Sequence, residues 1–463
     1  MTKAQLFLFL ILELSVTAFA KTTIYVSSSM GNDQNSGLTI QDPKKSIKEA
    51  LGNGDEIYLM AGDTFFETLR LVKKKVTRYG EGGNPVICGF KRIIKPKWEK
   101  VGNSIWRINL STDNYSGFQK GSSTLNNIGC IHDIESDEIH GKKVQYFDKL
   151  KEDWDIWQTE QCGAGVAGNQ FDYLYIYLST NPNLYNLEFS VGTAAVTMND
   201  ATLDGVNIIG WGFGISANHK SIIRNARIDA IGGMIQLGAS PFVCYGNGVE
   251  FYVANNISDC IVENCYISRC YDCACTIQGS RHQGATPTNI VFRNNLIVGC
   301  CQGWEDFLNN GEGVNYQNCR FENNIVCYSE SGFGYPSSVV RYSHVLGNNH
   351  SGSRGMIIKG NIFVGGNLYR SGEYEGKYCS NVWVRNKFYA TPSSYLLCNY
   401  LGTKNYLKLP AEKHAIRQTE QSYRSLTGDR TTKIYYYSRQ KADKKARSVI
   451  RRYLRNHKSL VSR

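Results

Sequence analysis

Five segments between residues 221 and 366 repeat one pattern of apolar and polar positions. They align on an anchor residue, which is Asn225, Asn264, Asn294, Asn323 or Gly360. Two places before the anchor stand Ile223, Val262, Phe292, Phe321 and Ile358, and three places after it stand Ile228, Ile267, Ile297, Val326 and Phe363. Both sets are apolar, so we expect them to face a core, with the anchor in a tight bend that suits Asn.

The residue just before each anchor carries a charge whose sign alternates from one segment to the next. These residues are Arg224, Glu263, Arg293, Glu322 and Lys359. If equivalent positions stack on one another, each charge has opposite charges on both sides, which adds a few tenths of a kcal/mol per pair. The alternation therefore predicts that the five segments are neighbours in space.

The anchors are 39, 30, 29 and 37 residues apart. A period near thirty accommodates several short strands and turns, and the longer intervals then carry inserted loops. We expect an all-β solenoid of parallel strands, with neighbouring coils about 4.8 Å apart and stacked Asn side chains at one turn.

The start of the chain adds a resemblance to a known superfamily. The resemblance rests on the segments IYVSSSMGNDQNSGLTIQDPKKSIKEAL and GDEIYLMAGDTFFETLRL near the start, and LYIYLSTNPNLYNLEFS farther on. Over residues 22 to 370 the sequence resembles bacterial secreted right-handed parallel β-helix proteins of the pectate-lyase-like superfamily. The resemblance implies a polysaccharide ligand along one face of the helix and a lyase, glycoside hydrolase or sugar epimerase activity. It is specific for the fold and not for the reaction, because fold alone does not give function.

Near this start, Asp42 followed by Pro43 predicts the beginning of an amphipathic helix through Ile47, Ala50 and Leu51. We expect this helix to cover the open end of the solenoid, where strand edges need protection.

The two ends of the sequence differ from the solenoid pattern. Residues 1–20 have Lys3, the apolar run LFLFLIL and a small-x-small ending at Ala20, which predicts a secretory signal peptide and a secreted or periplasmic protein. No other stretch is apolar over the roughly 18 residues that a membrane span needs. We therefore divide the chain into a signal peptide (1–20), an N-terminal cap with the first coils (21–100), an irregular insertion or early coils (101–195), the main β-helix (196–410) and a basic tail of helix-forming composition (411–463).

The net charge of +12 resides almost entirely in that tail. From residue 411 to the end, 15 Lys and Arg stand against 4 Asp and Glu. The main body is almost neutral, so we expect no nucleic-acid partner for it. The tail has a weak apolar stripe at Val449, Ile450, Tyr453 and Leu454. We expect either a solvated or loosely docked tail, or one that contacts an acidic polymer, a membrane surface or a partner.

Five of the 15 cysteines fall in CIVENCYISRCYDCAC, residues 260–275. Cys270 and Cys300 share one inward position, and Cys260 and Cys319 share another position four before the anchor, so we expect core packing or a stacked surface, since a free cysteine packs as a small hydrophobe. Cys270 and Cys273 form a lone C-x-x-C without the second pair typical of zinc sites. The sequence predicts no metal site here, and no full disulfide framework.

Three acidic side chains are predicted to converge, and we take them as candidate catalytic residues. Glu250 lies in the inserted part of the 39-residue interval, Asp272 eight places after its anchor and Glu305 eleven places after its own. The coil geometry puts the Cα atoms of Asp272 and Glu305 roughly 11 Å apart, with carboxyls about 5 to 10 Å apart. Glycoside hydrolysis uses two carboxyls at such separations. Asp306 is the alternative to Glu305, because adjacent strand residues point to opposite faces.

Other side chains nearby suit carbohydrate binding. We predict that Tyr245, Tyr271 and Trp304 offer flat rings for a sugar to stack on, and that His219, Arg281 and His282 bind a uronate or sulfate group. Ordinary packing of the rings and ordinary hydrogen bonding of the histidines are the alternatives.

Three functional hypotheses remain open. A glycoside hydrolase would use the acids directly, without a cofactor. A polysaccharide lyase or epimerase would take its base from His219 with Lys220, or from Arg281 with His282, and would use the acids to hold Ca²⁺. A non-catalytic carbohydrate-binding or polysaccharide-export protein would have its acids more than about 12 Å apart or pointing inward.

Overall fold

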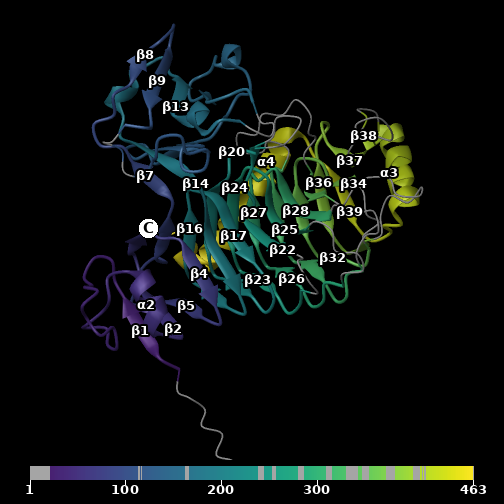
Figure 1. Cartoon of the computed structure of the whole chain (residues 1–463). Coiled ribbons are helices and arrows are strands. Elements are labelled where there is room, and N and C mark those ends of the chain that lie inside the picture. The colour runs from purple at the N-terminus through teal and green to yellow at the C-terminus, as the bar shows by residue number, and fades with distance from the viewer. Residues whose placement is uncertain are drawn as a thin grey trace, which may run out of the picture.

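The computed structural model is a parallel β-helix, as predicted, in which each coil contributes a strand to each of three long sheets (Figure 1). It describes residues 21–112, 115, 117–161, 166–237, 244–252, 257–279, 286–308, 315–329, 343–346, 354–371, 381–399, 407–408, 410 and 413–461. The predicted signal peptide, Arg281 and His282 lie outside these residues.

The three sheets run the length of the solenoid. Sheet A contains β1 (Thr23–Val26), β2 (Glu56–Met60), β5 (Lys75–Tyr79), β15 (Thr202–Asp204), β18 (Ile222–Arg224), β23 (Ile261–Glu263), β26 (Val291–Arg293), β29 (Arg320–Glu322), β32 (Ile357–Lys359) and β35 (Val382–Val384). Sheet B contains β3 (Thr64–Phe65), β6 (Val86–Cys88), β16 (Asn207–Ile209), β19 (Arg227–Ile231), β24 (Tyr266–Cys270), β27 (Leu296–Val298), β30 (Ile325–Cys327), β33 (Ile362–Val364), β36 (Lys387–Ala390) and β39 (Lys433–Tyr436). Sheet C contains β4 (Leu69–Val72), β14 (Leu187–Asn199), β17 (Trp211–Ala217), β22 (Val249–Tyr252), β25 (Cys273–Gly279), β28 (Gln302–Leu308), β31 (Val345–Leu346), β34 (Tyr369–Ser371), β37 (Tyr395–Asn399) and β38 (Leu407–Lys408).

The predicted register of the repeats is confirmed. The second residues before the anchors pair in sheet A, the third residues after them pair in sheet B, and all ten side chains are buried. The charged residues before the anchors are in register, as expected, and the Arg293 guanidinium lies 2.6 Å from Glu263. Arg224 and Glu322 form ion pairs with Asp204 and Arg320. The anchors form the bend between sheets A and B, with φ between 54° and 66°. This left-handed conformation suits Asn and Gly, which explains the anchor's identity.

The stacked amides lie one residue beyond the anchors. Asn295, Asn324, Asn361 and Asn386 are fully buried, and each side-chain oxygen accepts from the backbone N–H of the equivalent residue one coil earlier. Because the donors and acceptors satisfy one another along the stack, polar side chains can remain inside the turn at no cost in lost hydrogen bonds.

A helix covers the N-terminal end of the solenoid, as expected, but it begins later than predicted. Helix α2 (Ile47–Asn53) buries Ile47 and Ala50 in the core, and its N-cap is Ser46. Asp42 is not the cap, because its carboxylate accepts hydrogen bonds from Ser36 instead.

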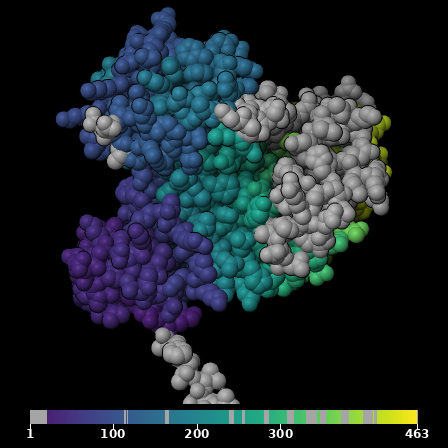
Figure 2. Space-filling view, viewed as in Figure 1, coloured from purple at the N-terminus to yellow at the C-terminus, as the bar shows by residue number. Residues whose placement is uncertain are grey.

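The segment between the first coils and the main coils builds a small subdomain at the side of the solenoid. An antiparallel sheet of β8 (Glu99–Lys100), β9 (Ile105–Asn109), β12 (Ile156–Trp157) and β13 (Tyr173–Tyr177) packs over its own apolar core. The antiparallel strands β7 (Phe90–Arg92), β10 (Ile131–Asp133) and β11 (Glu138–His140) join it to β14. Three short 3-10 helices occur here: η1 (Phe147–Lys149), η2 (Gly168–Phe171) and η3 (Pro182–Leu184). In Figure 2 this subdomain, in blue, stands out above the teal coils.

The basic tail is part of the fold and not a solvated extension. Helix α3 (Lys413–Thr427) inserts Tyr423 into the core, and β39 adds the last strand of sheet B. Helix α4 (Arg439–Asn456) then runs back along the outside of sheet B, followed by η4 (Lys458–Leu460). The Ser459 carbonyl accepts from the Asn84 backbone N–H in the first coils. The tail is not solvated because its apolar stripe, which includes Val449 and Tyr453, is buried against the sheet.

Twelve of the described cysteines are not part of any disulfide, and eleven of these twelve are buried. Cys260, Cys270, Cys300 and Cys319 belong to the main core, as predicted. Among the described residues, none of the helices combines the length and the apolarity needed to cross a bilayer.

Candidate active site

The three predicted acids lie together on the outer face of sheet C, on consecutive coils. Glu250 is on β22, Glu305 is on β28, and both align with Thr276 on the strand between them. Two strand steps put the Cα atoms of Glu250 and Glu305 about 10 Å apart. Asp272 lies directly before β25, on the intervening coil.

Asp272 and Glu305 form a close pair. Their nearest carboxylate oxygens and the Cys273 sulfur all lie within 4.8 Å of one another. This is just below the range expected from the sequence. The Gln302 amide nitrogen donates to Asp272 at 3.3 Å and fixes one side of the pair.

Burial makes ionisation of these acids unfavourable. Glu305 is 5% exposed and Glu250 is 6% exposed. Loss of water raises the pKa of Glu250 to about 7, to which the nearby Asp272 charge contributes. Burial raises the pKa of Asp272 to about 6 against the opposing effects of Gln302 and Arg370. The pKa of Glu305 is well above its usual range, because it is buried and faces Asp272. The pair can therefore hold one proton near neutral pH, as a general acid requires.

Neutral polar side chains complete the floor of the site. Asn247 donates to Glu250 at 3.1 Å, and Gln278 donates to the same carboxylate oxygen. Within the part of the chain that the structure describes, the buried Thr276 Oγ1 and Gln302 Oε1 have no hydrogen-bond partner. Buried polar atoms of this kind are rare.

Arg370 was not identified from the sequence. It lies on β34, in the same column as Glu305, and only 3% of it is exposed. Its charge lowers the pKa of both Asp272 and Glu305, so it favours their ionised forms. The sequence did indicate this position, because Arg370 follows its anchor by ten residues and Glu305 follows its own anchor by eleven.

Two of the predicted stacking rings are not on the surface. Trp304 aligns with Val249 and Cys275 on the inner side of sheet C and is fully buried. Tyr271 is also fully buried, and its hydroxyl donates to the Gly129 carbonyl at 3.0 Å. Neither ring has a face that a sugar can reach, so their assignment as binding residues is wrong.

Tyr245 is half-buried on β21 (Cys244–Tyr245), which pairs with β20 (Met234–Ile235). Its ring lies 6.4 Å from that of Phe213, which is on β17 and was not identified from the sequence. These two rings remain as sugar-binding candidates near the predicted site.

The other predicted residues do not join the acid pair. His219 lies in the turn after β17, where its Nδ1 accepts from the Ser258 backbone N–H at 3.2 Å. Asp306 points inward, because it aligns with the core residue Ile277, and this leaves Glu305 as the outward acid. Arg281 and His282 fall among the residues that the structure does not describe.

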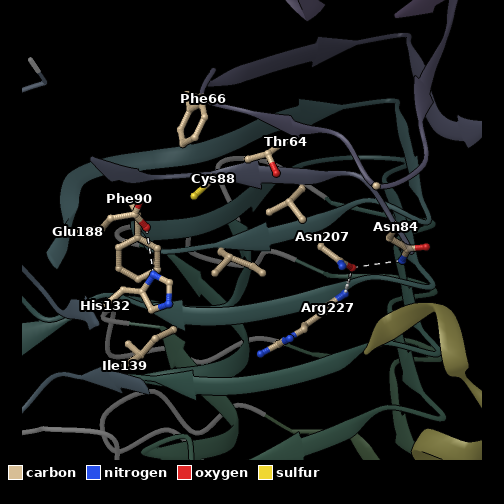
Figure 3. Close-up of a pocket in the computed structure, with 13 residues that line it drawn as sticks. Thr64, Phe66, Asn84, Cys88, Phe90, His132, Ile139, Glu188, Asn207 and Arg227 are labelled. Carbon is tan, nitrogen blue, oxygen red and sulfur yellow. Dashed lines mark hydrogen bonds and ion pairs between the residues drawn. The ribbon is translucent and has the colours of Figure 1, made fainter. Parts of the chain in front are cut away.

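A separate pocket of about 340 Å³ lies on the outer face of sheet B, over the first coils (Figure 3). Phe66, Phe90 and Ile139 give it apolar walls, and His132 contacts Glu188 at one end. Glu188 is the one carboxylate among the described residues that line it, and that carboxylate is bonded to His132. The pocket therefore lacks the close acid pair found on sheet C.

Comparisons with known proteins identify no family. No family model matches the sequence, and no curated protein matches it. Similar solved structures include XylC in complex with xylose, 11% identical, with 89% of this chain and 82% of that chain covered and a TM-score of 0.40. A GH136 lacto-N-biosidase from Eubacterium ramulus is 12% identical over 90% of this chain and 68% of that one, with a TM-score of 0.34. An alginate lyase from Paenibacillus sp. str. FPU-7 is 12% identical over 82% and 95%, with a TM-score of 0.32. Likenesses this distant assign no activity.

Proposed function

We propose that this protein is exported and hydrolyses glycosidic bonds of a polysaccharide bound along sheet C, with Asp272 and Glu305 as the catalytic carboxyls. The observation that carries the proposal is the closeness and burial of that pair. Retaining glycosidases have carboxyls about 5 to 5.5 Å apart, and inverting ones about 6.5 to 9.5 Å apart. Since the nearest atoms of this pair lie within 4.8 Å, the separation favours retention of configuration.

The two carboxyls have different surroundings, which suggest different roles. Glu305 is the more buried and has the more strongly raised pKa, so it is the proton donor to the glycosidic oxygen. Asp272 is half-buried, accepts a hydrogen bond from Gln302 and is influenced by the Arg370 charge, so it is the carboxylate that attacks C1. Glu305, now ionised, then removes a proton from the water that releases the sugar from Asp272.

Glu250 lies two coils from Glu305, beyond the reach of the same bond. With Asn247 and Gln278 bonded to one of its oxygens, it is placed to hold a hydroxyl of a neighbouring sugar. Tyr245 and Phe213 offer rings on the same face.

The alternative is elimination at a uronate residue. It is favoured by one observation, that Asp272, Cys273 and Glu305 are close enough to hold a divalent cation. A cation there would neutralise the substrate carboxylate, and Arg370 would be the nearby basic group.

The test is to incubate the purified protein with a panel of neutral and uronate-containing polysaccharides, following reducing ends and absorbance near 235 nm together. Hydrolysis produces reducing ends without absorbance, and D272N and E305Q should each lower kcat by at least about 100-fold. Absorbance together with dependence on Ca²⁺ would replace hydrolysis with elimination. Polymer binding with neither signal across the panel would count against an enzyme.

A further inference from the structure

The outer face of helix α4 carries a row of cations that the carboxylate site on sheet C does not use. Lys444, Arg447, Arg451 and Arg455 are exposed at spacings of three or four residues, which place them along one side of the helix. From Lys444 to Arg455 the row extends about 16 Å. Arg439, Lys441, Arg452 and Lys458 are also exposed and add charge to both ends and one side of it. We call this surface the cationic strip.

Few negative groups oppose the strip. Asp443 is the one acidic residue of α4, and it is half-buried. Within the described residues, Lys444, Arg447, Arg451 and Arg455 make no ion pair. Like charges at i,i+4 spacing repel one another, so pairing within the helix does not account for the row.

The inner face of α4 is fixed to the solenoid. Ala442, Ala446 and Val449 pack on Cys327, Val364 and Tyr389 of sheet B. The Tyr453 hydroxyl lies 2.9 Å from the Asn294 carbonyl and 3.1 Å from that of Cys265. The cations are therefore held in a straight row on a rigid support.

This packing decides between the kinds of acidic partner. A helix that binds a membrane inserts its apolar face between the lipids, and here that face is already buried in the protein. What remains outside is charge alone, arranged in a line. A linear chain with regularly spaced anionic groups is the partner that such a row fits, since it can pair with several cations at once.

We propose that the cationic strip binds an acidic polysaccharide, with uronate or sulfate groups, and holds it along the outside of sheet B. The choice of a polysaccharide over other polyanions rests on the proposed function, but the binding itself does not require catalysis. Because the strip and the carboxylate pair lie on different sheets, the strip would tether the protein to a polymer without occupying the site on sheet C.

The test measures binding of the full chain to polygalacturonate and to heparin by calorimetry over a range of salt concentrations. We expect binding that weakens as salt rises, because each neutralised anionic group releases counterions. The triple variant R447E/R451E/R455E should lose at least tenfold in affinity, and R447Q/R451Q/R455Q should lose less. The matched control K97E/K120E/K151E changes the net charge equally at exposed positions of the subdomain, and it should bind as the parent does.

Equal loss in the control, or no loss in the triple variant, would overturn the proposal, because the binding would then reflect net charge or another surface. Tighter binding of duplex DNA or of phosphatidylserine vesicles than of both polysaccharides would also overturn it. The variant D272N separates this proposal from the proposed function, since it should abolish turnover and leave polymer binding unchanged. Thermal melting confirms that each variant is folded.

Discussion

At the scale of single residues, the buried carboxyls of the candidate site lower the stability of the folded protein when they are ionised. Glu250 has a pKa of about 7 in the folded protein, against 4.5 for an ordinary glutamate. A raised carboxyl pKa means that the folded state prefers the protonated form. The contribution of Glu250 to the free energy of unfolding is therefore fully present below about pH 4.5 and is lost as the pH rises through 7. Asp272 and Glu305 act in the same direction.

We predict that Glu250→Gln reduces this pH dependence. The amide stays neutral, so urea unfolding should show a smaller fall in the free energy of unfolding between pH 4.5 and 7.5. The difference should reach up to about 3 kcal/mol, from 1.36 kcal/mol per unit of pKa change. Glu49→Gln, at an exposed position on α2, is the control and should follow the parent. An unchanged slope in Glu250→Gln would mean that this carboxyl ionises freely in the folded protein.

A second prediction concerns Arg370, which acts on the acid pair through its charge. Replacing it with Gln removes a cation that holds down the pKa of Asp272, so this pKa should rise above 6. Since Asp272 must be ionised to attack, the acidic limb of the kcat/KM profile should move to higher pH by about one unit. Arg354→Gln, at an exposed position, should leave the limb in place. A lower rate with an unmoved limb would assign Arg370 a purely structural role.

At the scale of elements, the asparagine stack carries a large share of the specificity of the turn between sheets A and B. Asn324 accepts from the backbone of Asn295 at 2.9 Å and donates to the Phe292 carbonyl at 3.0 Å and to Asn361 at 3.1 Å. Removing its side chain leaves buried partners on both neighbouring coils without bonds.

We predict that Asn324→Ala lowers the free energy of unfolding by about 3 kcal/mol, since each unsatisfied buried group costs about 1 to 3 kcal/mol. Chemical denaturation measures this directly. Asn53→Ala removes an exposed amide at the end of α2 and should cost well under 1 kcal/mol. Similar losses in both variants would show that the stack contributes little.

The elements that the sequence predicted well are those whose pattern repeats without interruption. The same apolar, charged and bend positions recur around Asn264, Asn294 and Asn323. The register of these strands, the alternating charges and the bend could therefore be predicted from one sequence. Alternation alone left open whether Glu305 or Asp306 faces outward, and the structure shows that Glu305 does, because Asp306 aligns with the core residue Ile277.

Trp304 could not be placed from the repeat, because the alternation of inward and outward side chains is broken at the start of β25 and β28. Ala274 and Cys275 both belong to the core, and a Cβ on Gly303 would lie 2.7 Å from Val326, so two consecutive residues face inward there. The inward-facing positions of the strand are therefore shifted by one residue, and Trp304 faces the core. The position of Tyr271 depends on the subdomain, which is not part of the repeat, because its hydroxyl bonds to the Gly129 carbonyl there.

At the scale of the whole molecule, the basic tail joins the two ends of the solenoid. It closes the last coil with α3 and β39, covers the apolar outer face of sheet B with α4, and ends beside the first coils at Asn84. The composition of the tail suggested a soluble extension because its charges outnumber its apolar residues. The buried apolar residues of α4 lie on one side of the helix, however, and that side determines where the helix packs.

This arrangement predicts that Val449→Asp detaches α4 while Ser448→Asp does not. Val449 is 3% exposed against sheet B, so a carboxylate there would be buried without a partner, at a cost above about 2 kcal/mol. Ser448 is the adjacent exposed residue and makes the same change in charge. Thermal melting should show a drop of several degrees for Val449→Asp alone. Limited proteolysis should cut its tail faster and leave the coils intact, because α4 covers sheet B but contributes no strand to it. Equal protection of the tail in both variants would mean that α4 is held by the charges on its outer face, which the packing on sheet B argues against.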